Sequence, residues 1–88
     1  MFIKKINNKT YFIEESTRRN KKYDVYDSNY RYLTSFGDKR YQHYHDRLGL
    51  YQDLDHWDQE RRRLYRLRHT ESHANPKKAG YWSWYWLW

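Results

Sequence analysis

The stretch FIKKINNKTYFIEES at residues 2–16 has the pattern of two strands joined by a tight turn. Apolar residues gather on both sides of Asn7 and Asn8, and adjacent Asn residues accept the left-handed backbone of a hairpin turn. A second pair of candidate strands follows at 23–26 and 30–36, separated by turn-forming residues. Two successive hairpins predict a small antiparallel meander. The basic run at 18–22, between the hairpins, has the composition of a loop.

After Gly37 the spacing of the apolar residues changes from that of strands to that of a helix. Apolar residues recur at i, i+3 and i+7 through residues 41–48, between a potential N-cap at Asp38 and a potential stop at Gly49. This spacing predicts a helix of about three turns over residues 38–49.

A second helix is predicted from Asp55, as its cap, to about Arg68. Acidic residues in its first turn and Arg residues later match the helix dipole. Trp57 and Leu64 fall on its apolar stripe, and we expect both to be buried together with Tyr41 where the two helices meet each other or the sheet.

The C-terminal segment YWSWYWLW, residues 81–88, has seven apolar residues around Ser83. Its periodicity fits strand and helix equally. Residues 70–80 are polar, contain the only Pro and have the composition of a loop. Taken together, residues 1–88 are predicted to form a single α+β domain, with a small N-terminal antiparallel sheet of two hairpins, two helices and an aromatic segment that closes the core.

The composition limits the class of protein. The chain has 88 residues, 18 Lys and Arg against 11 Asp and Glu, and a net charge of +7, so a large multi-substrate enzyme is excluded. With no Cys, disulfides and thiolate zinc sites are excluded too. The 11 Tyr, 5 Trp and 3 Phe outnumber the aliphatic residues, which predicts an aromatic core. No apolar run approaches the roughly 20 residues of a membrane span, and no secretory leader is recognisable, so neither a span nor export is expected.

Histidine and carboxylate residues are numerous, and such side chains form hydrolytic metal sites. They lack an HExxH pairing or similar ligand spacing, so we predict no catalytic residue, metal or cofactor, with a small metal-dependent nuclease or hydrolase as a third alternative. We expect Asp55 to cap a helix, Asp46 and Asp58 to pair with Arg, and His56 and His69 to hydrogen-bond within the fold. The full set is His43, His45, Asp46, Asp53, Asp55, His56, Asp58, His69 and His73.

Clustered Lys and Arg attract phosphate backbones through counterion release, and exposed aromatic rings among them can stack on unpaired bases. An ordinary solvated helix face with some Arg paired to carboxylates is the alternative. The residues predicted to contact phosphate are Arg18, Arg19, Lys21, Lys22, Arg62, Arg63 and Arg66.

Four Trp residues alternate along the C-terminal segment. Burial in the core is the first interpretation, because the chain has few other large apolar side chains. Anchoring of a partner protein is the second, and contact with a membrane surface is the third. The candidate partner-binding residues are Trp82, Trp84, Trp86 and Trp88.

Several motifs resemble a family of short, uncharacterised proteins encoded by large double-stranded DNA viruses of algae and protists. They are FGDKRYQHYHD at 36–46, the step at 49–51, LDHWDQERR at 54–62, Tyr65, the Arg68–His69 pair and NPKKAGYWSWYWLW at 75–88. The resemblance covers about residues 23–88. It implies a viral protein of the host cytoplasm or nucleus, or of the virion, and implies no activity.

The expected function is therefore non-enzymatic binding of an acidic polymer, with nucleic acid without sequence specificity as the partner. The alternative is a minor virion component that bridges other viral structural proteins. Arg and aromatic residues serve both kinds of surface, so composition does not separate the two functions. The oligomeric state is left open.

Overall fold

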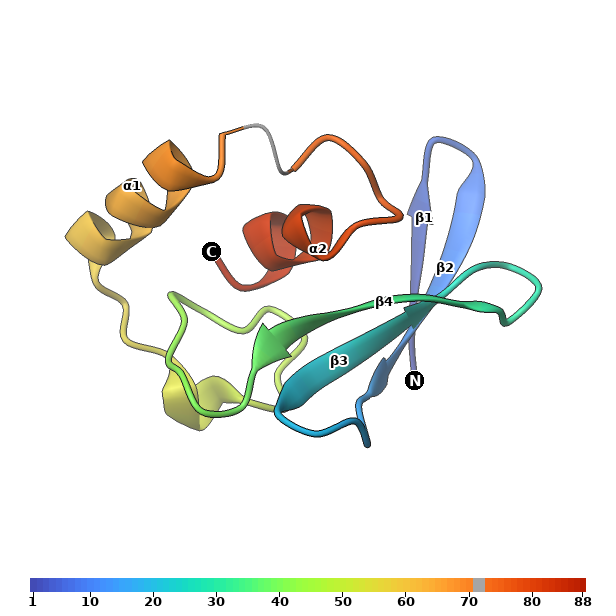
Figure 1. Cartoon of the computed structure of the whole chain (residues 1–88), viewed down its shortest axis with the longest axis horizontal. Coiled ribbons are helices and arrows are strands. Elements are labelled where there is room, and N and C mark those ends of the chain that lie inside the picture. The colour runs from blue at the N-terminus through green and yellow to red at the C-terminus, as the bar shows by residue number, and fades with distance from the viewer. Residues whose placement is uncertain (71–72) are drawn as a thin grey trace.

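Four antiparallel strands in the order β1-β2-β3-β4 form one sheet, and two helices follow it along the chain (Figure 1). The structure is a computed structural model and describes residues 1–70 and 73–88. Residues 71 and 72 of the predicted loop at 70–80 lie outside the described residues. The predicted α+β class is confirmed. The elements are β1 (Phe2–Ile6), β2 (Lys9–Glu15), β3 (Lys21–Tyr26), β4 (Tyr32–Asp38), a 3-10 turn η1 (Gln52–Leu54), α1 (Gln59–Arg68) and α2 (Ala79–Trp86).

The first hairpin forms as the sequence predicted. Asn7 and Asn8 have φ values of 50° and 66°, the left-handed conformation of a two-residue hairpin turn. Ile6 then pairs directly with Lys9, and the register continues to Phe2 opposite Ile13. The local turn chemistry therefore sets which side chains of β1 and β2 share a face.

The core lies between one face of the sheet and α2, which packs against β4 (Figure 1). Trp82 is its centre: its ring lies 5.3 Å from that of Tyr11 and 6.3 Å from that of Phe36. The C-terminal segment, which the sequence left as strand or helix, is thus a helix that closes the core. The buried core residues are Tyr11, Ile13, Tyr23, Val25, Phe36, Leu48, Trp82 and Leu87. Neither helix of the described chain is long and apolar enough to cross a bilayer.

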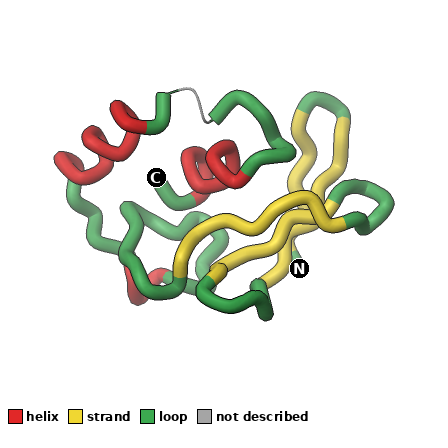
Figure 2. The backbone as a smooth tube through the Cα atoms, viewed as in Figure 1, coloured by secondary structure: helices red, strands yellow, loops and turns green. Residues whose placement is uncertain are grey.

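The predicted helix over 38–49 is wrong, because this segment is extended and looped (Figure 2). Asp38 ends β4, and its carboxylate accepts from the main-chain N–H of Arg40, which closes a turn and not a helix. Further on, the main chain bonds to residues 54–57: the His56 N–H donates to the His43 carbonyl at 2.9 Å, and the Trp57 N–H donates to Tyr44. These long-range bonds use groups that a helix would pair locally.

The predicted second helix exists but begins later, at Gln59, and Asp58 is its cap in place of Asp55. The Asp58 carboxylate accepts from the main-chain N–H groups of Glu60 and Arg61. Trp57 has a φ of 55°, so the right-handed helix cannot extend back through it.

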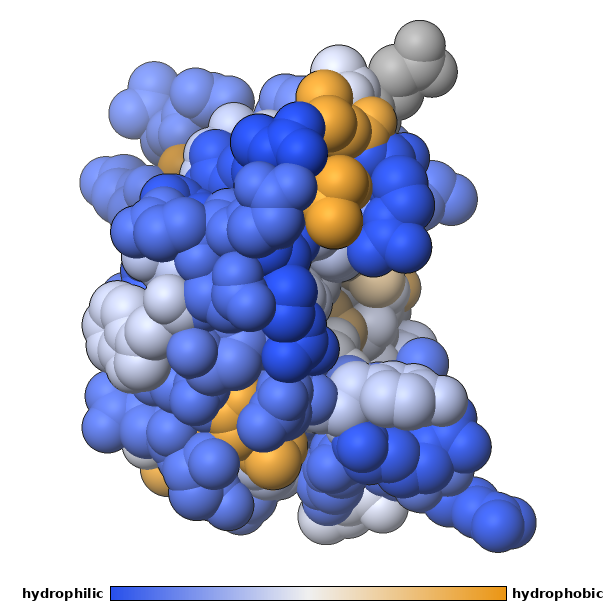
Figure 3. Space-filling model, turned by 90° about the vertical axis from the view of Figure 1, so that its left-hand side faces the viewer, coloured by the Kyte–Doolittle hydropathy of each residue, from blue (hydrophilic) through white to orange (hydrophobic). Residues whose placement is uncertain are grey.

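The predicted burial of Trp57, Leu64 and Tyr41 is also wrong, because their exposed fractions are 57%, 44% and 63%. The side of α1 that faces the rest of the molecule carries Arg62, Tyr65 and other polar or aromatic residues in place of the leucine stripe. Seen from the α1 side, the surface is mainly hydrophilic with small apolar areas (Figure 3).

Replacing the observed cap, Asp58→Ala, is expected to lower the free energy of unfolding by about 0.5–2 kcal/mol, because two main-chain donors of α1 lose their acceptor. Urea unfolding followed by far-UV circular dichroism measures this loss. Asp53→Ala, which removes an exposed carboxylate within η1, is the matched control. Equal stability of the two variants would contradict the assignment of the cap.

Candidate nucleic-acid interface

Three arginines converge on the C-terminal end of α2. Arg62 Nε and Arg66 Nη2 donate to the main-chain oxygen of Trp88, at 2.7 and 3.1 Å. Arg47, from the segment after β4, donates to the carbonyl oxygen of Tyr85 at 3.3 Å. The last carbonyls of a helix lack intrahelical partners and carry partial negative charge, so this end of α2 attracts cations.

The three guanidinium groups repel one another. The pKa values of Arg47 and Arg66 are lowered from their usual range. Burial is the larger cause for both residues, and the charge of Arg62 is the second. Within residues 1–70 and 73–88, none of the three forms an ion pair with an Asp or Glu side chain. Arg62 also lies over the Tyr44 ring and Arg66 over the Trp84 ring. The fold therefore gathers three positive charges around main-chain oxygens and aromatic rings.

A shallow hollow of about 240 Å³ lies beside this cluster, lined by Gln59, Arg62, Arg63 and Arg66. Arg63 pairs with Glu60 at the surface. The sequence placed Arg62, Arg63 and Arg66 in one candidate site, and the structure brings these three together. Arg47 was missed, because nothing local in the sequence indicates that residue 47 returns to α1.

The other predicted basic residues do not join this surface. The turn between β2 and β3, which carries Arg18 and Arg19, lies far from α1 (Figure 1). The Arg18 guanidinium lies 3.6 Å from Asp24 and 3.9 Å from the centre of the Tyr32 ring. Arg19 is exposed.

The prediction that Lys22 contacts phosphate is wrong, because this residue is only 1% exposed and cannot reach a phosphate. Its ammonium donates to the Tyr41 carbonyl at 3.0 Å and to His43 Nδ1 at 2.7 Å. Burial lowers the pKa of Lys22 to about 8, against the opposing effect of Asp46 and other carboxylates. Gly37 leaves room for the buried Lys22 side chain, because a Cβ at residue 37 would lie 2.7 Å from Lys22 Cδ. The φ of 75° at Gly37 also suits glycine.

Asp55 links two histidines to the segment after β4. Its carboxylate accepts from His43 Nε2 at 2.6 Å, from His45 Nδ1 at 2.7 Å and from the main-chain N–H of Asp46 at 2.7 Å. Burial alone would raise the pKa of Asp55, but these three hydrogen bonds outweigh it and hold the pKa below its usual range. Asp55 is therefore a buried connector between chain segments in place of the predicted helix cap.

Asp46 also differs from its prediction, because it accepts from the Tyr23 hydroxyl at 2.5 Å and from two main-chain N–H groups, not from Arg. The predicted hydrogen bonds of His56 and His69 are confirmed: His56 Nδ1 accepts from the Asp58 N–H, and His69 Nδ1 donates to the Tyr65 carbonyl. Among the described side chains, no three His, Asp or Glu residues are grouped to hold a metal ion.

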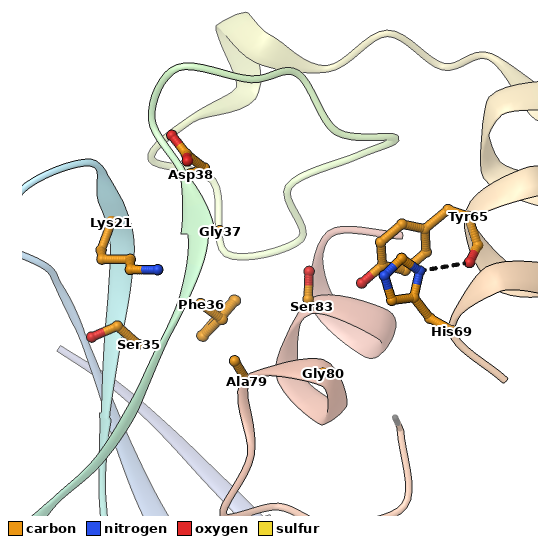
Figure 4. A pocket seen from close by; sticks show the side chains of 10 residues that line it. All are labelled: Lys21, Ser35, Phe36, Gly37, Asp38, Tyr65, His69, Ala79, Gly80 and Ser83. Atoms are coloured by element: carbon orange, nitrogen blue, oxygen red, sulfur yellow. Dashed lines mark hydrogen bonds between the residues drawn. The ribbon is translucent and has the colours of Figure 1, made fainter. Parts of the chain in front are cut away.

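A larger pocket of about 420 Å³ lies between the end of β4 and the two helices (Figure 4). Lys21 reaches it from the strand side, while Tyr65 and His69 approach from α1 (Figure 4). Of the basic run at 18–22, Lys21 is the residue that lines this pocket. The lining is completed by Ser35, Phe36, Gly37, Asp38, Ala79, Gly80 and Ser83.

The four candidate partner-binding tryptophans are packed within the molecule to different degrees. Trp82 is fully buried, so it is a core residue and cannot anchor a partner. The other three are half-buried: His73 stacks on Trp84, the Lys4 ammonium lies over Trp86, and Tyr65 stacks on Trp88 with the ring centres 4.4 Å apart.

Comparisons of the chain with protein families, with curated proteins and with solved structures gave no match.

Proposed function

We propose that this protein is a non-enzymatic binder of nucleic acid that holds the phosphate backbone, without reading its sequence, through Arg47, Arg62, Arg63 and Arg66. One observation carries the proposal: three of these guanidinium groups are gathered around main-chain oxygens and, in the described chain, have no Asp or Glu side chain as an ion-pair partner. Such a site favours an anion over a neutral ligand.

The donor count supports a phosphate ligand. A guanidinium carries five N–H groups, and Arg62 and Arg66 each use one of them on the Trp88 oxygen. Phosphate oxygens would accept several of the remaining N–H groups and would relieve the repulsion between the arginines. The Arg63–Glu60 pair lies at the exposed surface, so it does not prevent Arg63 from turning to a phosphate. The net charge of +7 also attracts phosphate at longer range.

Replacing Arg47 and Arg63 together with Gln is expected to reduce the salt dependence of binding. Each phosphate contact contributes a slope of about −0.9 in log affinity against log salt on duplex DNA, so losing two contacts should make the slope shallower by about two. Fluorescence anisotropy of labelled DNA at several salt concentrations measures this slope. The variant keeps the hydrogen bonds of Arg62 and Arg66 to the Trp88 oxygen, so the fold is expected to persist.

The double variant Arg31→Gln with Arg40→Gln is the matched control. It removes the same charge from exposed positions outside the cluster, and its slope should stay close to that of the wild type. The proposal fails if the wild-type protein at micromolar concentration forms no complex with duplex DNA, single-stranded DNA or RNA at about 0.15 M salt.

A second candidate function, a virion component that bridges viral structural proteins, is favoured by the exposed leucines of α1. Leu64 and Leu67 are both exposed beside arginines on the outer side of the helix, and apolar residues with Arg are common in protein interfaces. Together with the viral source proposed from the motifs, this predicts stoichiometric recovery of the protein in purified virions. Its absence from virions would leave nucleic acid as the better partner.

A further inference from the structure

A row of apolar side chains crosses the outer face of the sheet, opposite the core. Ile3 pairs with Phe12, Phe12 pairs with Tyr26, and Tyr26 pairs with Tyr32. Directly opposed residues of an antiparallel sheet share a face, so the row runs across all four strands. The residues next to them along the strands, such as Ile13 and Val25, point the other way and are buried in the core.

Tyr30, from the turn before β4, extends the row. Its ring centre lies 4.5 Å from that of Tyr26 and 6.1 Å from that of Phe12. Its φ is 59°, a conformation that a bulky side chain seldom adopts and that the surroundings must hold. The Asp27 carboxylate holds this turn by accepting from the main-chain N–H groups of Asn29 and Arg31, both at 2.9 Å.

The outermost rings are open to solvent: Tyr30 is 50% exposed and Tyr32 is 43% exposed. The Arg18 guanidinium lies over the Tyr32 ring at 3.9 Å, so one end of the row carries a cation. The carboxylates nearby are already engaged. Asp24 accepts from Ser35 and pairs with Arg18, and the Tyr30 hydroxyl donates to the Glu14 carboxylate.

We infer that the outer face of the sheet is a stacking platform for the unpaired bases of single-stranded nucleic acid, formed by Phe12, Tyr26, Tyr30 and Tyr32 with Arg18 at its edge. This inference rests on the proposed function and deepens it, because it names single strands as the preferred ligand.

Three features of the row fit this ligand. Every base has a flat face that stacks on an aromatic ring, whatever the sequence. Neighbouring strands lie about 4.8 Å apart, so the rings on β2, β3 and β4 span about 10 Å, which suits two or three bases of an extended strand, as on other antiparallel sheets that bind RNA. Arg18 provides a cation for a phosphate beside them. A duplex keeps its bases paired and internally stacked, so it cannot use these rings.

The test compares a short oligo(dT) and oligo(U) with a duplex of the same length, by fluorescence anisotropy at fixed salt. The variant Tyr30→Ser with Tyr32→Ser is expected to raise the Kd for the oligonucleotides about tenfold or more, since each stacked base contributes at least a fivefold factor. Its Kd for duplex should stay within about twofold. The conservative variant Tyr32→Phe keeps both rings and leaves the Tyr30 hydroxyl on Glu14, so it should bind as the wild type does.

Tyr41→Ser is the matched control. Tyr41 is also an exposed tyrosine with a guanidinium over its ring, that of Arg40 at 5.4 Å, but it lies outside the row. Circular dichroism confirms that each variant is folded. Where a Ser variant does not fold, Leu at the same positions keeps apolar contact without the flat ring and gives the same comparison.

Unchanged oligonucleotide affinity in the Ser variant, or an equal loss for duplex, would overturn the platform. That result would leave the proposed function standing, because the Arg47 and Arg63 variant tests it on duplex. If the wild-type protein binds neither duplex nor oligonucleotide, the proposed function fails and the platform fails with it.

Discussion

Replacing Trp82 with Ala is expected to lower the free energy of unfolding by about 3–5 kcal/mol, the usual cost of truncating a fully buried Trp. The ring contacts Tyr11 and Phe36, and its Nε1 donates to the Pro76 carbonyl at 2.7 Å. Total stability of a domain is only about 5–15 kcal/mol, with small domains at the lower end. The variant should therefore be largely unfolded at a temperature or urea concentration that the wild type tolerates.

Urea unfolding followed by far-UV circular dichroism gives the two free energies without relying on Trp fluorescence. Trp84→Ala is the matched control, because Trp84 lies two residues away in α2 but is half-buried against His73 and Arg66. We expect a clearly smaller loss for Trp84→Ala. If both variants lose the same stability, Trp82 is not the centre of the core and the packing of α2 has been misassigned.

The sheet could be predicted from the sequence because its signals are local. The two Asn residues fix the first turn, and alternation of apolar residues marks the strands on both sides of it. The helix α1 was predicted for a similar reason, although its start was placed too early. The C-terminal helix could not be assigned, since a short and nearly continuous apolar run fits either kind of element.

The segment after β4 was mispredicted because long-range contacts determine its conformation. The apolar spacing at 41–48 fits a helix, but His43 and His45 bind Asp55, which lies 12 and 10 residues further along the chain. A pattern of apolar residues contains no information about such polar bonds. Where tertiary hydrogen bonds and local propensity compete, the tertiary bonds decide.

The candidate binding residues likewise divide into those that the local sequence identifies and those that only the fold brings together. Arg62, Arg63 and Arg66 belong to one helix, so the sequence alone placed them together. Lys22 was predicted to be exposed because a basic run usually is, and its burial depends on the space left by Gly37 on the neighbouring strand. Arg47 and the row of tyrosines across the sheet depend on chain reversals and on the strand register. They became visible only in the folded structure.

Replacing Asp55 with Ala is expected to cost about 3–5 kcal/mol of unfolding free energy, because removing one member of a buried polar network leaves the others unpaired. The Asp55 side chain is only 5% exposed. Without it, His43 Nε2, His45 Nδ1 and the Asp46 N–H lose their acceptor, and one of the carboxylates that offset the charge of Lys22 is removed. The loss should exceed that of Asp58→Ala, although the sequence pointed to Asp55 as the helix cap.

The pH dependence gives this prediction a second readout. The pKa of Asp55 is below its usual range in the folded protein, so its contribution is complete above the unfolded pKa of about 3.9 and is lost as the pH falls through the folded value. The difference in stability between wild type and Asp55→Ala should therefore be largest near neutral pH and should shrink below about pH 4. Urea unfolding at a series of pH values measures this difference. A difference that stays constant down to the acid limit, or a loss no greater than that of Asp58→Ala, would show that the Asp55 carboxylate does not hold this segment in place.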